Sequence, residues 1–294
     1  MTQSAKKETS QHPRLLQWWC NIDDALPRIS VGGLDVSLTL ASAVFLGCVR
    51  YIAEFVMVTI FGWPAVSFVT KTASASVPAM LHSSLLVPSL WQTFRIHRYR
   101  PSESLAEAPA FYQHAATCLL QFCTGYMLYD CLLNVLWLNW TMDSIQGDAL
   151  MFLGHHIATT LYMTLCRIHR AGHQSAFICM FLGEMTNPLH NAYFIAIAAQ
   201  QLECCNGPLS QQLYMMIEYA FSVAYVAVRA LVAPFFFVHA TFSLWYDRNP
   251  QVPVMTIAFW TFLIWLVEIA SIPYIQDCWN KIVVGRSMVG TAEL

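Results

Sequence analysis

The sequence has 294 residues, of which 57% are hydrophobic and 11% charged, and its mean hydropathy is +0.48. Soluble domains carry about 45–50% apolar and about 25% charged residues, so this composition excludes a single soluble domain and favours an integral membrane protein. The formal net charge is −2, and no basic patch interleaved with aromatic residues is present, which excludes nucleic acid as a partner.

Seven apolar stretches are long enough to cross a bilayer, because a helix needs about 20 residues to span a hydrocarbon core of roughly 30 Å. Their backbones must satisfy their own hydrogen bonds in lipid, and the stretches are too long for barrel strands. The predicted fold is therefore all-α: a polytopic membrane helical bundle or barrel of about seven transmembrane helices around a polar cavity. The seven stretches are residues 35–61, 73–93, 114–138, 149–167, 173–199, 212–241 and 253–274.

The second stretch is the weakest, because serine, proline and histidine dilute it, and without it the protein has six spans. Residues 1–34 form an exposed segment in which Leu15–Trp19 predicts an interfacial helix, and the polar start predicts no cleaved signal peptide. The remaining predicted regions are a first transmembrane helix over 35–69, a membrane domain over 70–275 and a C-terminal tail over 276–294.

The distribution of positive charge predicts the orientation. A seven-span arrangement places ten of the 15 lysines and arginines on the side of the N-terminus and three, including Lys281, on the other. Because positive loops stay cytosolic, this predicts a cytosolic N-terminus. Cysteines in or beside the spans are interpreted as small apolar residues. A disulfide from Cys204 or Cys205 to Cys278, outside the predicted spans, remains open.

The predicted spans contain many ionisable side chains, each of which costs free energy in lipid unless it pairs or faces inward. Arg50 and Glu54, four residues apart, predict an ion pair. Arg229 is predicted to pair with Glu218 or Glu268, or alternatively to grip the anionic headgroup of a lipid. The full set is Arg50, Glu54, His82, Asp130, His155, His156, Glu184, His190, Glu218, Arg229 and Glu268.

The middle spans carry the strongest functional signal. Asp130 lies in the third span, His155 and His156 in the fourth, and Glu184 in the fifth. Consecutive spans are expected to be neighbours, so two carboxylates can flank two imidazoles at low dielectric. A carboxylate that accepts the proton of one imidazole nitrogen makes the other nitrogen more basic, which suits acid–base or acyl-transfer chemistry.

Helical spacing adds polar groups around this centre. Glu184, Asn187 and Asn191 are spaced i, i+3 and i+7 and are predicted to share one helical face. Thr159 follows His155 by one turn. Adjacent residues on a helix point about 100° apart, so His155 and His156 are expected to take different roles, one facing the cavity and the other a neighbouring helix.

A metal site built from His82, His155, His156 and Glu184 is the chemical alternative. It is disfavoured because the chain lacks the several histidine-rich boxes of membrane desaturases. Its one H-x-x-x-H pattern, His169 to His173, contains Arg170 and lies at a loop. The sequence therefore predicts no bound metal.

The run Gly154-His155-His156, with Asp130 one span earlier and Glu184-Met185-Thr186-Asn187 one span later, resembles the TLC-domain family. His82 and the segment Tyr126–Asp130 also resemble its pattern, and the resemblance covers about residues 70–275. The family includes the ceramide synthases, which move an acyl chain from coenzyme A to a sphingoid base and carry a matching histidine pair. Their downstream motif has His-Asp and a second Asp three residues later. This chain has Gly183-Glu184 and Asn187, and so looks closer to the small TLC domain-containing proteins.

The resemblance implies a multi-pass protein of the endoplasmic reticulum with a role in lipid composition. It implies membrane lipids as partners, no bound cofactor and acyl-coenzyme A as a co-substrate, and it leaves an oligomer open. The predicted catalytic residues are His155, His156, Asp130 and Glu184. The predicted substrate-binding residues are His82, Tyr126, Thr159, Asn187, Asn191 and Arg229.

Two functional hypotheses stay open on the sequence. The first is an acyltransferase-like enzyme that acts on a membrane lipid or long-chain amine through His155 and His156. The second is a non-catalytic protein for lipid binding, sensing or trafficking that keeps the cavity without the chemistry. A channel or transporter is less favoured, because no inverted repeat or pair of broken half-helices is visible in the sequence.

Overall fold

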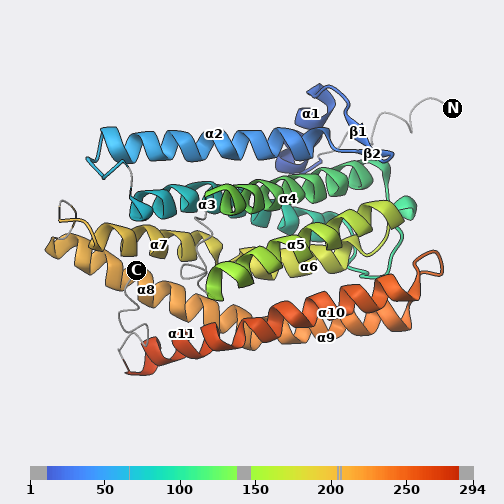
Figure 1. Cartoon of the computed structure of the whole chain (residues 1–294). Coiled ribbons are helices and arrows are strands. Elements are labelled where there is room, and N and C mark those ends of the chain that lie inside the picture. The colour runs from blue at the N-terminus through green and yellow to red at the C-terminus, as the bar shows by residue number, and fades with distance from the viewer. Residues whose placement is uncertain (1–11, 66, 138–146, 204, 206, 285–294) are drawn as a thin grey trace.

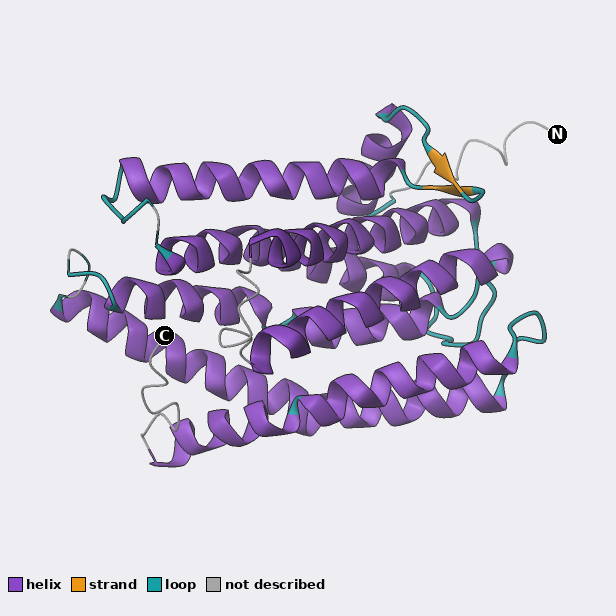
Figure 2. Cartoon of the chain, viewed as in Figure 1, coloured by secondary structure: helices purple, strands orange, loops and turns teal. Residues whose placement is uncertain are grey.

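The computed structural model describes residues 12–65, 67–137, 147–203, 205 and 207–284. This part of the chain is almost entirely helical, apart from one short hairpin (Figure 2). The N-terminal elements are α1 (Arg14–Ala25), β1 (Ser30–Val31), β2 (Leu34–Asp35), α2 (Ser37–Thr59), α3 (Phe68–Ile96) and the 3-10 turn η1 (Leu105–Glu107). The remaining elements are α4 (Ala110–Trp137), α5 (Gly147–His169), α6 (His173–Glu184), α7 (Asn187–Gln200), α8 (Pro208–Val226), the π-helix η3 (Ala227–Val232), α9 (Ala233–Tyr246), α10 (Val254–Ala270) and α11 (Ile272–Val284).

The long helices run side by side. Figure 1 shows α2 at one side, then α3 with α4, then α5 with α6, and α9 with α10 at the other side, while α7, α8 and α11 gather at one end. Within the described residues, four helical segments are long and apolar enough to cross a membrane: Ser37–Thr59, Ala110–Leu133, Pro208–Tyr246 and Val254–Val283. The predicted membrane helical bundle is confirmed, whereas the count of seven spans stays a prediction.

Helix α3 explains why one predicted span has so many polar residues. It is a continuous helix of 29 residues with Pro78 and Pro88 inside it. Its polar side chains, among them Ser74, His82 and Ser83, are buried, because α3 packs against α2, α4, α6 and α7. The polar composition of this stretch therefore reflects an interior helix, and α3 is not among the described helices that are apolar enough to cross a membrane.

The predicted fifth span, residues 173–199, is broken in two. Helix α6 ends at Glu184 and α7 begins at Asn187, with Pro188 in the first turn of α7. Pro188 has no N–H group to donate to the carbonyl of Glu184 four residues earlier, and the missing hydrogen bond coincides with the break here, whereas α3 continues past Pro78 and Pro88. The predicted single helix was wrong, but Asn187 lies beside Glu184 as the spacing predicted and donates a hydrogen bond to it across the break.

The predicted sixth span is longer than expected and changes its helical winding. Helices α8 and α9 are joined by η3, which has π-type hydrogen bonding and carries Arg229. Pro234 follows in the first turn of α9 and removes one backbone donor there. Single π-turns of this kind occur frequently at functional sites, so Arg229 is a candidate functional residue.

Small residues allow α4 to approach α2 closely. A Cβ atom at Gly125 would lie 2.4 Å from the carbonyl oxygen of Thr39 and 2.8 Å from the Cβ of Ser42. These distances leave room only for glycine at this crossing. Close backbone packing of this kind stabilises the association of membrane helices. The crossing fixes α4, and with it Asp130, relative to the rest of the bundle.

Helix α1 and the hairpin that follows it precede α2, and α1 packs against the bundle. Helix α1 buries Leu16, Trp19, Cys20 and Asp23, the spacing of one amphipathic face, and contacts α2, α3 and α4. The hairpin of β1 and β2 pairs Val31 with Leu34 across two glycines of positive φ, the geometry that tight two-residue turns require.

The last helix includes residues 276–284, which were predicted to belong to the C-terminal tail. Lys281, counted among the positive charges on the side opposite the N-terminus, is buried within α11, where its Nζ lies 2.8 Å from Oδ2 of Asp277 and 3.7 Å from Oε1 of Glu218. Cys278 is a buried free thiol, so no disulfide reaches it, and Cys204 lies outside the described residues.

Candidate functional site

The two adjacent histidines of α5 face different surroundings. His156 is buried against α4, where its Nδ1 lies 2.9 Å from Oδ2 of Asp130. His155 lines a cavity together with Thr159, which lies one turn further along the helix. The pair therefore separates into a residue held by a carboxylate and a residue accessible to a ligand, as the 100° between neighbouring positions requires.

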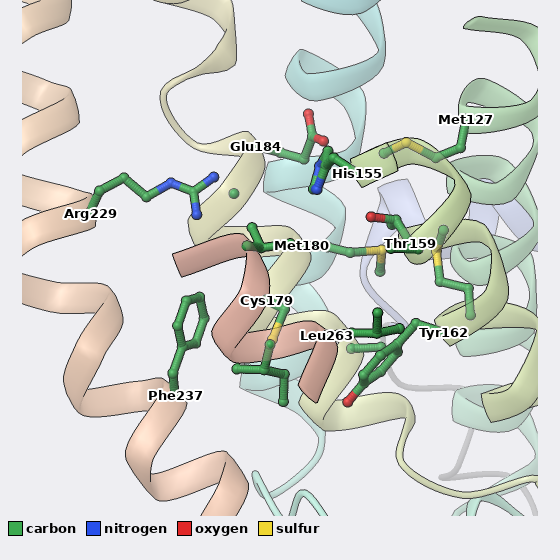
Figure 3. Close-up of a pocket in the computed structure, with 16 residues that line it drawn as sticks. Met127, His155, Thr159, Tyr162, Cys179, Met180, Glu184, Arg229, Phe237 and Leu263 are labelled. Atoms are coloured by element: carbon green, nitrogen blue, oxygen red, sulfur yellow. The ribbon is translucent and has the colours of Figure 1, made fainter. Parts of the chain in front are cut away.

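The cavity lies between α4, α5, α6, η3, α9 and α10. Figure 3 shows Glu184 and His155 together at one end, the guanidinium of Arg229 extending toward them, and Phe237, Leu263 and Tyr162 at the opposite end. Polar groups therefore gather at one end of a mostly apolar space. Its lining residues are Met127, His155, Ala158, Thr159, Tyr162, Met163, Ala176, Cys179, Met180, Gly183, Glu184, Arg229, Phe237, Leu263, Ile264 and Val267.

Glu184 is held at the break between α6 and α7. Its Oε2 accepts hydrogen bonds from Oγ of Ser83 (2.6 Å) and from Nδ2 of Asn187 (2.7 Å), and lies 3.6 Å from Nδ1 of His82. Two neutral donors and an imidazole can stabilise an ionised carboxylate in a buried site. Asn187, which takes the place of the second acid in the ceramide synthase pattern, thus acts as a donor to the first.

His82 and Tyr126 lie behind the cavity rather than in its wall. His82 is fully buried, and its ring stacks on that of Tyr126 with centroids 4.1 Å apart. Neither ring nitrogen of His82 has a hydrogen-bond partner among the described residues. His82 and Tyr126 were predicted to bind substrate, but neither lines the cavity in this structure. His82 lies beside Glu184, and the Tyr126 ring lies beside that of His156.

Asn191 also lies away from the cavity. Its Nδ2 donates to the carbonyl oxygen of Asn187 at 2.9 Å within α7, and the side chain is buried. Since α7 is separate from α6, Asn191 does not follow Glu184 around a common helix. It is not among the cavity-lining residues, contrary to the arrangement that the spacing predicted.

Arg229 is buried in the cavity wall and has no carboxylate within 4.0 Å among the residues that the structure describes. The predicted pairing with Glu218 is wrong, because Glu218 accepts hydrogen bonds from Tyr193 and Tyr214 and lies near Lys281. The predicted pairing with Glu268 is not formed either. Nε of Arg229 and Oε2 of Glu268 each lack a hydrogen-bond partner in the described region.

Gly183 lies beside the Arg229 guanidinium. A Cβ at this glycine would lie 3.6 Å from Nη2 of Arg229, an ordinary van der Waals contact. Gly183 stands where the ceramide synthase pattern has histidine. Sequence reasoning did not select Gly183, Ser83 or Cys179 as site residues, since small residues and lone thiols give no periodic or charge signal.

The comparisons with known proteins fit this architecture. The model of the TLC domain matches residues 52–280, which is most of the chain. The chain belongs to the TLC-domain family. Neither the curated proteins nor the solved structures contain a significant match. The matched TLC domain runs from α2 into α11 and includes every element of the cavity, whereas α1 and the hairpin precede it.

Proposed function

We propose that this TLC-domain protein acts in lipid metabolism as an acyltransferase that uses the cavity beside His155. The observation that carries the proposal is the convergence of three side chains at one end of a mostly apolar cavity inside a membrane bundle. They are His155, Glu184 and the buried Arg229, which has no ion-pair partner among the described residues. An apolar chamber of this kind suits an acyl chain, and its polar end suits the group that reacts.

The chemistry assigned to His155 is general-base catalysis. As an amine or hydroxyl of a membrane lipid attacks the carbonyl carbon of an acyl thioester, the imidazole of His155 takes the proton of the attacking group. The new C–N or C–O bond forms, the C–S bond breaks, and the departing thiolate recovers the proton from the imidazolium. Acyl-coenzyme A is the thioester we propose, which makes coenzyme A the second product.

The other polar residues then have distinct roles. Asp130 fixes the orientation of His156 and so the segment of α5 that presents His155. Glu184 supplies negative charge that stabilises the imidazolium, and Arg229 binds an anionic oxygen of the headgroup or of the donor. We place the protein in the membrane of the endoplasmic reticulum with a cytosolic N-terminus, where acyl-coenzyme A reaches the bundle from the cytosol.

A second candidate function is lipid binding without turnover. It is favoured by Asn187, which replaces an acid of the ceramide synthase pattern. Asn187 and Ser83 both donate hydrogen bonds to Oε2 of Glu184. In this alternative Arg229 holds an anionic headgroup in the cavity, and His155 serves as a hydrogen-bond donor to it.

The deciding experiment measures transfer of a labelled acyl chain from acyl-coenzyme A to a mixture of long-chain amines and membrane lipids by the purified chain in lipid nanodiscs. We expect His155→Ala and His156→Ala to abolish transfer. His239→Ala is the matched control, because His239 is an exposed histidine of α9 that does not line the cavity.

Each outcome separates the two candidates. Transfer that survives both substitutions at positions 155 and 156 would refute the catalytic assignment. Absence of transfer by the wild type, combined with an anionic lipid that co-purifies with the wild type and is lost from Arg229→Gln, would establish the binding alternative.

A further inference from the structure

A second cluster of reactive side chains lies away from the cavity, between α1 and α4. The thiols of Cys20 and Cys118 and a ring nitrogen of His114 lie within 4.8 Å of one another. His114 and Cys118 are one turn apart on α4, and Cys20 faces them from α1. This cluster shares no residue with the cavity of His155, and Cys20 precedes the matched TLC domain.

A carboxylate completes the group. Oδ2 of Asp23, one turn after Cys20, lies 3.0 Å from Nε2 of His114, and its Oδ1 is buried without a hydrogen-bond partner among the described residues. A metal bound to Nε2 gains Asp23 as a fourth ligand. A metal bound to Nδ1 instead gains Asp23 as the acceptor that orients the imidazole.

The chemistry of the donors selects the metal. We propose that Cys20, His114 and Cys118, supported by Asp23, form a structural zinc site that fastens α1 to the membrane domain. Two thiolates, an imidazole and a carboxylate are ligands that Zn²⁺ prefers in tetrahedral sites. Zn–S bonds of about 2.3 Å place two sulfurs about 3.8 Å apart, so the donors need to contract by only about 1 Å from their present limit of 4.8 Å.

Charge and access also suit zinc. Two thiolates and one carboxylate carry three negative charges, which favour a divalent cation, and the guanidinium of Arg28, which Asp23 shares with Asp24 and Asp35, offsets part of the remainder. Both thiols are buried, while the His114 side chain is about one-third exposed and leaves a route for the ion. The site therefore attracts a divalent cation and is reachable from solvent.

The contact between α1 and α4 does not depend on the metal alone. Nε1 of Trp19 donates a hydrogen bond to Oγ of Ser89 at 2.9 Å, and the ring centroids of Trp19 and Phe122 lie 4.3 Å apart. Variants of the metal ligands are consequently expected to fold, which makes the proposal testable by substitution.

The test uses the full chain purified in detergent, equilibrated with Zn²⁺, freed of excess ion and analysed for bound zinc by mass spectrometry. We expect about one zinc per wild-type chain and loss of that zinc in Cys20→Ala and Cys118→Ala. Cys123→Ala is the matched control, because Cys123 is an equally buried cysteine of α4 outside the cluster, and this variant is expected to keep its zinc.

Thermal unfolding provides the second readout. Zinc is expected to raise the Tm of the wild type and of Cys123→Ala, and to leave the Tm of Cys20→Ala unchanged. The proposal fails if the wild type retains no zinc, or if Cys20→Ala and Cys118→Ala bind as much zinc as the wild type. It also fails if thiol mapping of the purified chain shows Cys20 and Cys118 joined in a disulfide.

Discussion

Nδ1 of His156 lies 2.9 Å from Oδ2 of Asp130, and this contact ties α5 to α4 directly beside the cavity. Both side chains are largely shielded from solvent, so removal of one leaves the other without its nearest partner. We expect Asp130→Ala to lower the free energy of unfolding by about 3 kcal/mol. The measurement is denaturant unfolding in detergent of the wild type, both single variants and the Asp130→Ala/His156→Ala double variant.

The double variant isolates the contact itself. A coupling energy of about 1–3 kcal/mol is expected for groups that touch. Additive effects of the two single substitutions would show that the contact contributes nothing to stability, and would leave Asp130 without the orienting role assigned to it. The pair His239→Ala with Asp130→Ala is expected to be additive, since His239 is an exposed residue of α9.

Substitution of Arg229 distinguishes a ligand-binding role of this residue from a structural one. It is buried and has no ion-pair partner among the described side chains, and its guanidinium carbon lies 5.9 Å from the centroid of the Tyr225 ring, so Arg229→Met removes the cost of a buried charge together with one cation–π contact. We expect the variant to be as stable as the wild type or more stable. Binding of an anionic lipid is expected to fall about 10- to 100-fold, the effect of losing one charge-assisted hydrogen bond.

The measurement for Arg229 is lipid affinity in nanodiscs, with a zwitterionic lipid as the reference ligand. Arg229→Lys keeps the charge and is expected to retain part of the affinity. A loss of stability of about 3–5 kcal/mol in Arg229→Met would instead indicate a structural ion pair and contradict the assigned role.

The sequence predicted the class of fold and the centre of the site because both depend on local patterns. Apolar stretches indicate membrane helices by length alone, and a histidine doublet is visible as a doublet. The polar character of α3 was harder to interpret, because whether Ser83 faces lipid or Glu184 depends on which helices surround it.

Other features depend on non-local geometry. The effect of Pro188 was not anticipated, although a proline inside a predicted span is a signal for a helix break. Arg229 was assigned two carboxylate partners that were plausible by span order, yet Glu218 is engaged by tyrosines of α7 and α8 instead. Cys20 and Cys118 lie far apart in the sequence, so no rule based on residue spacing predicts that their thiols are neighbours.

The helix crossing at Gly125 gives a stability prediction with an internal control. A Cβ at this position would lie 2.4 Å from the backbone oxygen of Thr39, which cannot rotate away. We expect Gly125→Ala to lower the free energy of unfolding by about 1–3 kcal/mol, the usual effect of overpacking. Gly154→Ala in α5 is the matched control, because a Cβ at that position would meet none of the described residues within 4 Å.

The control is expected to be neutral or to gain up to about 1 kcal/mol, since alanine is the better helix former. Thermal unfolding of the two variants in the same detergent decides the matter. Equal behaviour of Gly125→Ala and Gly154→Ala would contradict the close approach of α4 and α2.

The hairpin that follows α1 is predicted to loosen in acid. Burial raises the pKa of the Asp35 carboxyl, but hydrogen bonds from Ser37 and from the guanidinium of Arg28 outweigh burial and leave the pKa below its usual value. A carboxyl with a lowered pKa stabilises the folded state above its unfolded pKa of about 3.9, and this contribution disappears as the pH falls through the lower folded value. We therefore expect amide protection of the hairpin to be constant near neutral pH and to fall below about pH 4.

Hydrogen exchange of residues 28–37 as a function of pH measures this effect. Asp35→Asn removes the titrating group, so its profile is expected to be flat through the same pH window and to lie below that of the wild type at neutral pH. Arg28 is half exposed, which limits the size of the change. A wild-type profile that stays level down to about pH 2, or one that Asp35→Asn leaves unaltered, would show that Asp35 does not hold the hairpin to α2.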